Sequence, residues 1–510
     1  MRYKIPKELG SVKTLVTRFK AAEKRKHPWE DHLRECYEYS LPQRETFNQH
    51  SAGQRKNQHI YDSTAVIGAQ KYASRLQATM CPPWRRWSTL VAGSEIPEQE
   101  REAVQEGLDK VTEILFDHIN HSNFATQAHE AFLDLSVSTG VLTLEESDTE
   151  GSLLEFNAVP LAEVYPEEGP NGTIETMWRK RMVPIRNVDR MWPKANLSQD
   201  TKKKLKESPD EKIEIIEGTI YEPKSGFYYH CVIEKNAEHL VFTQEYEVSP
   251  WIAFREMVVP SEVLGRGRVM SVLPDIKTAN KVVEFTLRNA ALNIAGVYTG
   301  RDDGVINPYT INIAPNTVIP VGSNDTSNPT LRPLDRAGDA NLGYIVLEQL
   351  QKRINQALFA DPYGDLQQPV KSATEMALRG QELMQDSGSA FSRLQTEFIE
   401  KVIKRAVYIL KRNGKIPDIR VDGKEVTIKH TSPLARAQDQ EDLLAMQQFI
   451  EFNGALGPEN LMLGVKVEDL PSWSGKKLGI EQKLLRTDDE RTEMQQQAAQ
   501  ALAAQQAQPQ

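Results

Sequence analysis

The chain has 510 residues, with 62 Lys and Arg against 71 Asp and Glu, a formal net charge of −9 and 39% hydrophobic residues. This composition is typical of a globular chain of roughly two to four domains and excludes a disordered or collagen-like one. Cys36, Cys81 and Cys231 lie far apart without a CxxC pair, which argues against a disulfide scaffold or a cysteine-rich zinc site and favours a reducing compartment. No run of about 18 apolar residues occurs and the basic N-terminus lacks an apolar core, so we expect neither a membrane span nor a signal peptide.

Charge is distributed unevenly along the chain. Residues 1–28 carry nine Lys or Arg and two Glu, a net charge of +7, whereas residues 95–175 carry nineteen Asp or Glu against Arg101 and Lys110, a net charge of −17. Such asymmetry indicates either a partner surface or two solvated faces, and the sequence leaves both open.

Helical patterns dominate the first third. We expect helices over residues 11–40, over 62–80 with Asp62 or Ser63 as N-cap, over 97–119, and over 123–139. The pattern changes at residue 141. Six short segments rich in β-branched and aromatic residues predict strands of an α+β domain, at 141–147, 153–159, 175–183, 214–221, 227–234 and 239–246. A charged insertion at 194–212 predicts a short surface helix.

The most informative segment is 272–298. As a helix, its 24 residues from Asp275 to Tyr298 span roughly 36 Å and carry apolar side chains on more than one face. Such a helix needs cover from other chains or from a large core.

A Gly-, Asn- and Pro-rich stretch at 299–338 with strand-like pieces follows, and then a second helix at 340–360. Leu342, Val346, Leu350, Ile354 and Leu358 recur every four residues along this second helix, which is expected when a helix crosses a neighbour at an angle.

A loop at 361–372 leads into a long helix that continues to Arg412, with possible bends at Gly380 and at 387–389. One apolar face runs along it, formed by Phe391, Leu394, Phe398, Val402, Ala406 and Ile409. We then expect a hairpin over 418–430 with its turn at 422–423, and helices from 434 to about 452. The Gln- and Ala-rich tail is compatible with a helix or with disorder.

No catalytic motif is found. None of the three GlyLys pairs has the glycine or the Ser/Thr of a phosphate-binding loop, and GlyArgGly at 265–267 is too short for a dinucleotide fingerprint. His118 and His121 are three residues apart, but no HExxH accompanies them, and the serines lack a Gly-x-Ser-x-Gly turn. We therefore predict no catalytic residue, no metal ligand and no cofactor.

Several segments taken together resemble the portal, or head-to-tail connector, proteins of short-tailed bacteriophages. The resemblance covers about residues 15–430, and its segments follow the family's order. They are WEDH…YSLP at 29–42, IYDSTA at 60–65, CPPWRRW at 81–87, HSNF at 121–124, STGVLTL at 138–144, AVPLAEVY at 158–165, SPWI at 249–252, LGRGR at 264–268, LPDIKTAN at 273–280 and SATEMALR at 372–379.

The resemblance implies a non-enzymatic ring of identical subunits, usually twelve, at one capsid vertex, through which double-stranded DNA is packaged and ejected. It implies as partners the terminase large subunit, a tail adaptor protein, and the major capsid and scaffolding proteins, with no membrane. It places the protein in the virion, and in the host cytoplasm during assembly.

The resemblance also implies a map of parts in an α+β portal fold. A wing and outer body would occupy 1–271, paired stem helices 272–298 and 339–360, a clip 299–338, a tunnel loop 361–372, a long kinked helix returning to the wing 373–433, and a helical crown with the tail 434–510.

Candidate functional residues follow from this map. DNA-facing candidates are Lys371, Gln367 and Gln368. Clip docking candidates are Arg301, Asp302, Asp303, Asn307 and Tyr309. Candidates for the stem subunit interface are Val282, Phe285, Leu292, Leu342, Val346 and Leu350.

Two alternatives remain open. A metal-dependent nucleic-acid-processing enzyme would show an acidic Mg²⁺ cluster, and the acids at 95–175 form no recognisable motif. Another ring-forming virion connector, such as a tail adaptor, would share the long helices but fits a chain of this length less well.

Overall fold

The computed structural model describes residues 9–48, 51, 53–83, 85–97, 101–147, 151–295, 298–300, 331–333, 340–360, 390–419, 421, 424–430, 433–455, 465–466 and 470–478. The chain divides into two compact units. The first comprises Met1–His27, Ala73–Arg266 and Gly364–Gln510, and the second comprises Pro28–Tyr72 and Gly267–Tyr363. Helices and strands both contribute, so the α+β class is confirmed.

The first unit contains a five-stranded antiparallel sheet with the order β4-β5-β6-β7-β8. Its strands are β4 (Val164–Glu168), β5 (Ile174–Pro184), β6 (Lys212–Glu222), β7 (Phe227–Glu234) and β8 (His239–Tyr246). Four of them were predicted, whereas β4 was missed because its five residues include Pro166 and two glutamates, which are poor strand formers. Short 3₁₀ helices flank β4 at Leu161–Glu163 and Pro170–Gly172.

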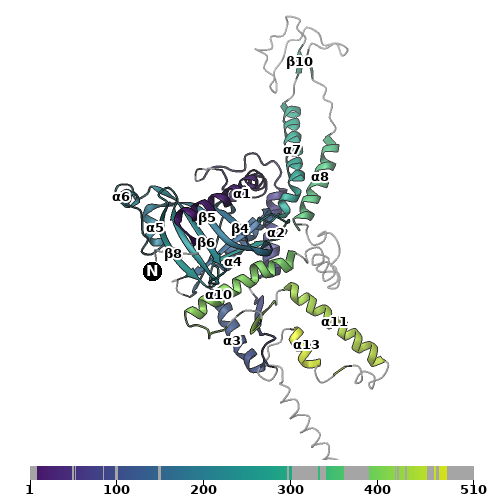
Figure 1. The fold of residues 1–510 in the computed structure, drawn as a ribbon. Helices are drawn as coiled ribbons and strands as arrows, with labels where there is room; N and C mark the ends of the chain where they lie inside the picture. The colour runs from purple at the N-terminus through teal and green to yellow at the C-terminus, as the bar shows by residue number, and fades with distance from the viewer. Residues whose placement is uncertain are drawn as a thin grey trace, which may run out of the picture. The chain divides into compact units, whose positions relative to one another are not determined.

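One face of this sheet is covered by the first half of helix α1 (Val12–Ser40), which confirms the helix predicted over 11–40 (Figure 1). Phe19 is fully buried and makes edge contacts with Tyr165 and Trp178, with ring centroids 5.3 and 6.0 Å apart. A glycine at position 218 gives Trp178 its space, because a Cβ there would lie 2.3 Å from the indole ring. Close packing between the rings on this face of the sheet and Phe19 therefore holds the helix in place.

A second apolar cluster of this sheet includes residues of helix α5 (Ile185–Met191), which was not predicted. The surface helix expected within 194–212 is α6 (Gln199–Glu207), and it begins at an N-cap in which Ser198 Oγ accepts a hydrogen bond from the Thr201 amide at 3.2 Å. Both helices are short and depend on neighbouring side chains for stability.

A second antiparallel sheet of the first unit has the order β3-β2-β9. Its strands are β2 (Thr139–Glu146), β3 (Leu154–Ala158) and β9 (Trp251–Arg255), and only β9 was not predicted. The helices packed with it in one apolar core are α3 (Arg101–Asn120), α4 (Phe124–Val137) and α10 (Glu400–Arg412). Phe398 lies fully buried in this core, with its ring centroid 4.6 Å from that of Phe254 and 5.2 Å from that of Phe132.

The long helix that contains Phe398 carries the predicted apolar face. Leu394, Phe398, Val402, Ala406 and Ile409 are all buried. A five-residue π-helix, Gln395–Ile399, precedes α10 and was not predicted. The bends expected at Gly380 and 387–389 lie outside the described residues.

The predicted hairpin over 418–430 is wrong. Strand β12 (Val426–His430) pairs with β1 (Ser88–Ala92), in the antiparallel register Ser88↔His430 to Ala92↔Val426. The predicted turn residues 422–423 lie outside the described residues, and β12 pairs with a strand that is far away in the sequence. Helices α11 (Pro433–Ala455) and α13 (Leu470–Leu478) complete the described part of this unit.

The second unit contains the second half of α1, a 3₁₀ turn at Pro42–Arg44, most of α2 (Thr64–Met80), and the helix pair α7 (Arg268–Ala295) and α8 (Ala340–Ala357). Helix α7 begins four residues before the expected 272, includes Pro274, and ends at Ala295 instead of 298. Tyr298–Gly300 form strand β10, which pairs with β11 (Leu331–Pro333). The strand-like pieces expected between these two strands lie outside the described residues.

Candidate functional site

The second unit contains the helix pair α7 and α8, which is the main candidate for a functional surface. The two helices lie side by side in antiparallel orientation (Figure 1). Arg268 Nη1 at the start of α7 donates to the Ala357 carbonyl at the end of α8 at 3.4 Å, and the Arg268 guanidinium lies 3.8 Å from the Phe359 ring centroid. Near the other end, a Cβ at Gly343 would lie 4.0 Å from Thr286 Oγ1. The two helices therefore stay paired over most of their length.

The pair is buried at one end only. In the first turns of α7, Leu273, Ile276 and Ala279 are buried, and in the second half of α8 so are Leu350 and Ile354. This end belongs to the core of its own chain.

Further along, large apolar side chains face solvent in the single chain. On α7, Phe285 is 56% exposed and Leu287 is 54% exposed. These residues are two apart, so they point about 200° apart around the helix. On α8 the exposed apolar residues are consecutive, namely Tyr344, Ile345 and Val346. Several large apolar side chains exposed on one helix pair indicate an interaction site.

The predicted interface residues divide between these two environments. Phe285 and Val346 are exposed and Val282 is half-buried, whereas Leu350 is only 8% exposed and is covered by its own chain. The side chains of Leu292 and Leu342 lie outside the described residues.

Three charged side chains on α7 pair with one another within the helix. Glu284 accepts from Lys281 Nζ at 2.8 Å and from Arg288 Nη2 at 2.5 Å. The hydrogen bond from Lys281 and the charges of Lys281 and Arg288 lower the pKa of Glu284, although burial opposes them. The helix therefore presents an apolar surface interrupted by a charged triad with a net charge of +1.

A polar clamp joins α7 to the loop that precedes α2. Asn280 is 6% exposed, and its Oδ1 accepts from the amides of Tyr61 and Asp62 at 2.6 and 3.1 Å. Its Nδ2 donates to the His59 carbonyl at 3.0 Å. Asp62 in turn accepts from Thr64 Oγ1 at 2.8 Å and from Gln351 Nε2 on α8 at 3.1 Å. One amide thus fixes the loop. Of the two predicted N-cap residues, Ser63 directly precedes α2 and its carbonyl accepts from the Ile67 amide at 3.0 Å, whereas Asp62 Oδ1 accepts from the Thr64 amide at 3.4 Å.

An open groove of about 830 Å³ lies beside this clamp, lined in part by Tyr39, His59, Tyr61, Lys277 and Lys281. Both lysines are engaged: Lys277 Nζ lies 3.0 Å from Glu35 Oε1, and Lys281 binds Glu284. The groove therefore offers no uncompensated lysine to a ligand.

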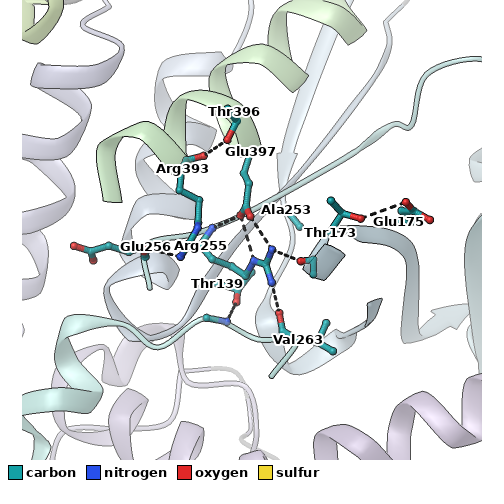
Figure 2. Close-up of polar contacts among 12 residues, drawn as sticks. Thr139, Thr173, Glu175, Ala253, Arg255, Glu256, Val263, Arg393, Thr396 and Glu397 are labelled. Carbon is teal, nitrogen blue, oxygen red and sulfur yellow. Dashed lines mark hydrogen bonds and ion pairs between the residues drawn. The ribbon is translucent and has the colours of Figure 1, made fainter. Parts of the chain in front are cut away.

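A ladder of charged residues in the first unit attaches the long helix to β9 and its neighbours. Arg255 lies at its centre, with a side chain only 3% exposed (Figure 2). Its guanidinium binds Glu397 of the π-helix through Nη2 to Oε1 at 2.7 Å and Nε to Oε2 at 3.2 Å, and also donates to the Val263 and Gly172 carbonyls.

The ladder continues along the helix at intervals of four residues. Arg393 donates to the Glu256 carbonyl, and Lys401 donates to the Ala253 carbonyl. Arg405 donates to the Leu144 and Val248 carbonyls at 3.2 and 2.8 Å. Desolvation lowers the pKa of Lys401 and of Arg405.

This ladder was not predicted from the sequence, from which only the apolar face of the same helix was identified. The regular spacing of charges next to that face was the available signal.

The DNA-facing candidates Lys371, Gln367 and Gln368 lie outside the described residues, as do the clip candidates Arg301, Asp302, Asp303, Asn307 and Tyr309.

Candidate metal-binding and reactive groups are few in the described part of the chain. It contains no group of three or more His, Cys, Asp or Glu side chains that could hold a metal ion. Cys36, Cys81 and Cys231 are buried free thiols, and burial raises the pKa of Cys36 to about 12 and that of Cys231 to about 11. None of the described helices is long and apolar enough to cross a membrane.

The comparison with known proteins gives the class. A family model described as "Bacteriophage head to tail connecting protein" matches residues 12–485, so the chain belongs to this family, and the predicted resemblance is confirmed. The chain is similar to the portal protein of Escherichia phage T7, with 21% identity over 430 residues that cover 82% of this chain and 78% of that protein.

Proposed function

We propose that this chain is a portal protein whose copies assemble into a ring, of usually twelve subunits, at one vertex of the virion capsid. Double-stranded DNA would pass through the ring during packaging and ejection, and a separate terminase would supply the work. Family membership supports this function, and the observation that carries it is the exposed apolar surface on α7 and α8.

A ring provides the cover that one chain lacks. Burying a side chain such as Phe285 or Ile345 contributes about 1.5–3 kcal/mol, and cyclic symmetry repeats the same contact at every interface. Because Phe285 and Leu287 project in widely different directions, neighbours on both sides are needed to cover them. A ring supplies one on each side, whereas a two-fold dimer supplies a single partner.

We assign the parts on the same basis. The pair α7 and α8 would be the stem, and 299–338 would be the clip, where Arg301, Asp302, Asp303, Asn307 and Tyr309 would meet the terminase large subunit and later the tail adaptor. Residues 361–372 would form the tunnel loop and 434–510 the crown. The wing and outer body within 1–271 would meet the major capsid and scaffolding proteins during assembly in the host cytoplasm. Pro28–Tyr72 belongs to the same compact unit as α7 and α8, which supports assigning it to the proposed stem region instead of the outer body.

The net charge of the chain favours passage of DNA over tight binding of DNA. A net charge of −9 per chain gives −108 for twelve copies, whereas a protein that grips DNA presents a strongly basic groove. A few basic residues such as Lys371, with Gln367 and Gln368 beside it, would keep DNA centred without arresting it. If phage carrying Lys371→Ala package and retain DNA as the parent does, Lys371 has no such role.

The stem interface can be tested with charge substitutions. Phe285→Glu and Ile345→Glu should each prevent assembly while circular dichroism stays unchanged, because both residues are solvent-exposed within the chain. Leu205→Glu on α6, where Leu205 is 38% exposed, is the matched control and should assemble normally. Sedimentation velocity measures the outcome, and full assembly of both stem variants would contradict the proposal.

A further inference from the structure

The N-terminal half of α1 carries a stripe of three lysines, Lys13, Lys20 and Lys24, on its solvent face. They are seven and four residues apart, which places them within an arc of about 40° and over about 17 Å of helix. Leu15, Phe19 and other apolar residues occupy the opposite face and pack against the five-stranded sheet. The stripe is therefore held outward by a well-packed helix.

Nothing in the described structure neutralises these lysines. They make no hydrogen bond or ion pair with the residues that the structure describes, although neighbouring cations do. Arg18 and Arg25 both bind Glu167, at 2.7 and 3.2 Å.

The only acidic residue among residues 9–27 is Glu23, and it binds Lys180 of β5. Glu23 and Glu167 are thus already engaged by other cations.

The arrangement carries a small intrinsic cost. Lys20 and Lys24 are four residues apart, and like charges at this spacing repel each other on a helix surface. Lys13 lies in the first turn of α1, where the helix dipole disfavours a cation and no acidic residue compensates. A polyanion bound along the stripe would relieve both effects.

The surface around the stripe discriminates between kinds of polyanion. Protein interfaces are built on apolar and aromatic anchors and are depleted in lysine. In the described part of α1 up to residue 27, no large apolar side chain is exposed, and Thr14, Thr17 and Ala21 lie between the lysines. A phosphate backbone needs only point charges, and about 17 Å of duplex axis carries roughly ten phosphates.

We propose that Lys13, Lys20 and Lys24 form a sequence-independent contact surface for the phosphate backbone of duplex DNA, separate from the stem and from the tunnel loop. Three phosphate contacts on an otherwise acidic chain give weak, salt-sensitive binding. Between about 50 and about 200 mM salt, three contacts would change the affinity by roughly 40-fold.

The test is fluorescence anisotropy of a labelled 30-base-pair duplex with the full-length protein across that salt range. The triple variant Lys13→Gln, Lys20→Gln, Lys24→Gln should bind at least about tenfold more weakly at the lowest salt. It should also lower the slope of log affinity against log salt by about 2–3. The triple Lys→Arg variant should bind as the parent does.

Three exposed lysines of α6 provide a control of equal charge, on a helix that carries Asp200 before them and Glu207 after them. Lys202→Gln, Lys203→Gln, Lys206→Gln should leave the slope unchanged. The stripe variant should still form rings in negative stain and melt at the parent's temperature or slightly above it, which separates loss of this surface from failure of the proposed ring. Unchanged DNA affinity in the stripe variant overturns the proposal, as does polyglutamate of equal charge binding the stripe more tightly than the duplex.

Discussion

The long helix of the first unit and the helix pair of the second unit treat apolar side chains in opposite ways, although the first unit also exposes Phe452 and Leu444 on α11. In the first, Phe398 and its aromatic neighbours are fully enclosed, and even the charges on the same helix are bound to backbone carbonyls or to a carboxylate. In the second, Phe285, Leu287 and Ile345 face solvent. A helix whose apolar face is enclosed by its own chain needs no further cover, whereas a helix pair with exposed apolar side chains needs cover from another chain.

The same substitution, Phe→Ala, can be made in both units and its effect on stability compared. Phe398→Ala should destabilise the first unit by about 3–5 kcal/mol, because it leaves a cavity among packed rings. Phe285→Ala should change the stability of the unassembled chain by less than about 0.5 kcal/mol, since its side chain is mostly in water. Urea unfolding of the dissociated chain measures both values, and equal losses would remove the distinction.

The charged ladder gives the next largest effect. Arg255→Met removes the partner of Glu397, whose side chain is only 17% exposed, and should cost about 3 kcal/mol. The double variant Arg255→Met, Glu397→Leu should recover much of that loss, since neither charge then remains. A single variant as stable as the parent would show that the pair does not anchor the long helix.

The clamp at Asn280 tests the second unit alone. Asn280→Ala leaves the amides of Tyr61 and Asp62 without their acceptor and should destabilise this unit by about 2 kcal/mol. Alkylation of Cys36, buried in this unit with a pKa raised to about 12, should then accelerate by roughly 30-fold.

Alkylation of Cys231, in the first unit, is the internal control and should keep its rate. Asn280→Asp retains the acceptor oxygens and should give an intermediate rate. Equal acceleration at both cysteines would mean that the units do not open separately.

The smallest expected effect is a pH dependence of the first unit. Burial lowers the pKa of His230, whose Nδ1 lies 3.0 Å from Thr219 Oγ1. As pH falls below about 6.5, the unfolded chain takes up a proton that the folded chain does not, so stability falls. His230→Gln should reduce the stability difference between pH 7.5 and 5.5 by roughly 1 kcal/mol, measured by urea unfolding. An unchanged difference would assign the pH dependence to other groups.

How far the sequence predicts this structure depends on the distance between partners. Helices α1, α4 and α10 followed from local spacing of apolar residues, and so did the enclosed face through Phe398. Strand β12 was misassigned because its partner β1 is remote in the sequence, and an AspGly signal nearby favoured a local turn. Helix α7 includes Pro274 as its seventh residue, where a proline removes one backbone hydrogen bond, so the local sequence does not indicate that the helix begins at Arg268.

The candidate site was predictable only in part. The composition of 272–298 indicated that α7 needs outside cover. The spacing of apolar residues on α8 did not show which of them its own chain would bury, such as Leu350. The clamp at Asn280 and the pairing of Arg255 with Glu397 depend on contacts across 219 and 142 residues, and no local pattern signals them.

We propose that sister copies arranged around a bore cover the exposed surface of α7 and α8. Negative-stain imaging of the purified full-length protein tests this, with its mass measured by light scattering. The account predicts rings with a central hole and a mass about twelve times 57.7 kDa. Compact monomers of 57.7 kDa that persist at high protein concentration would contradict it.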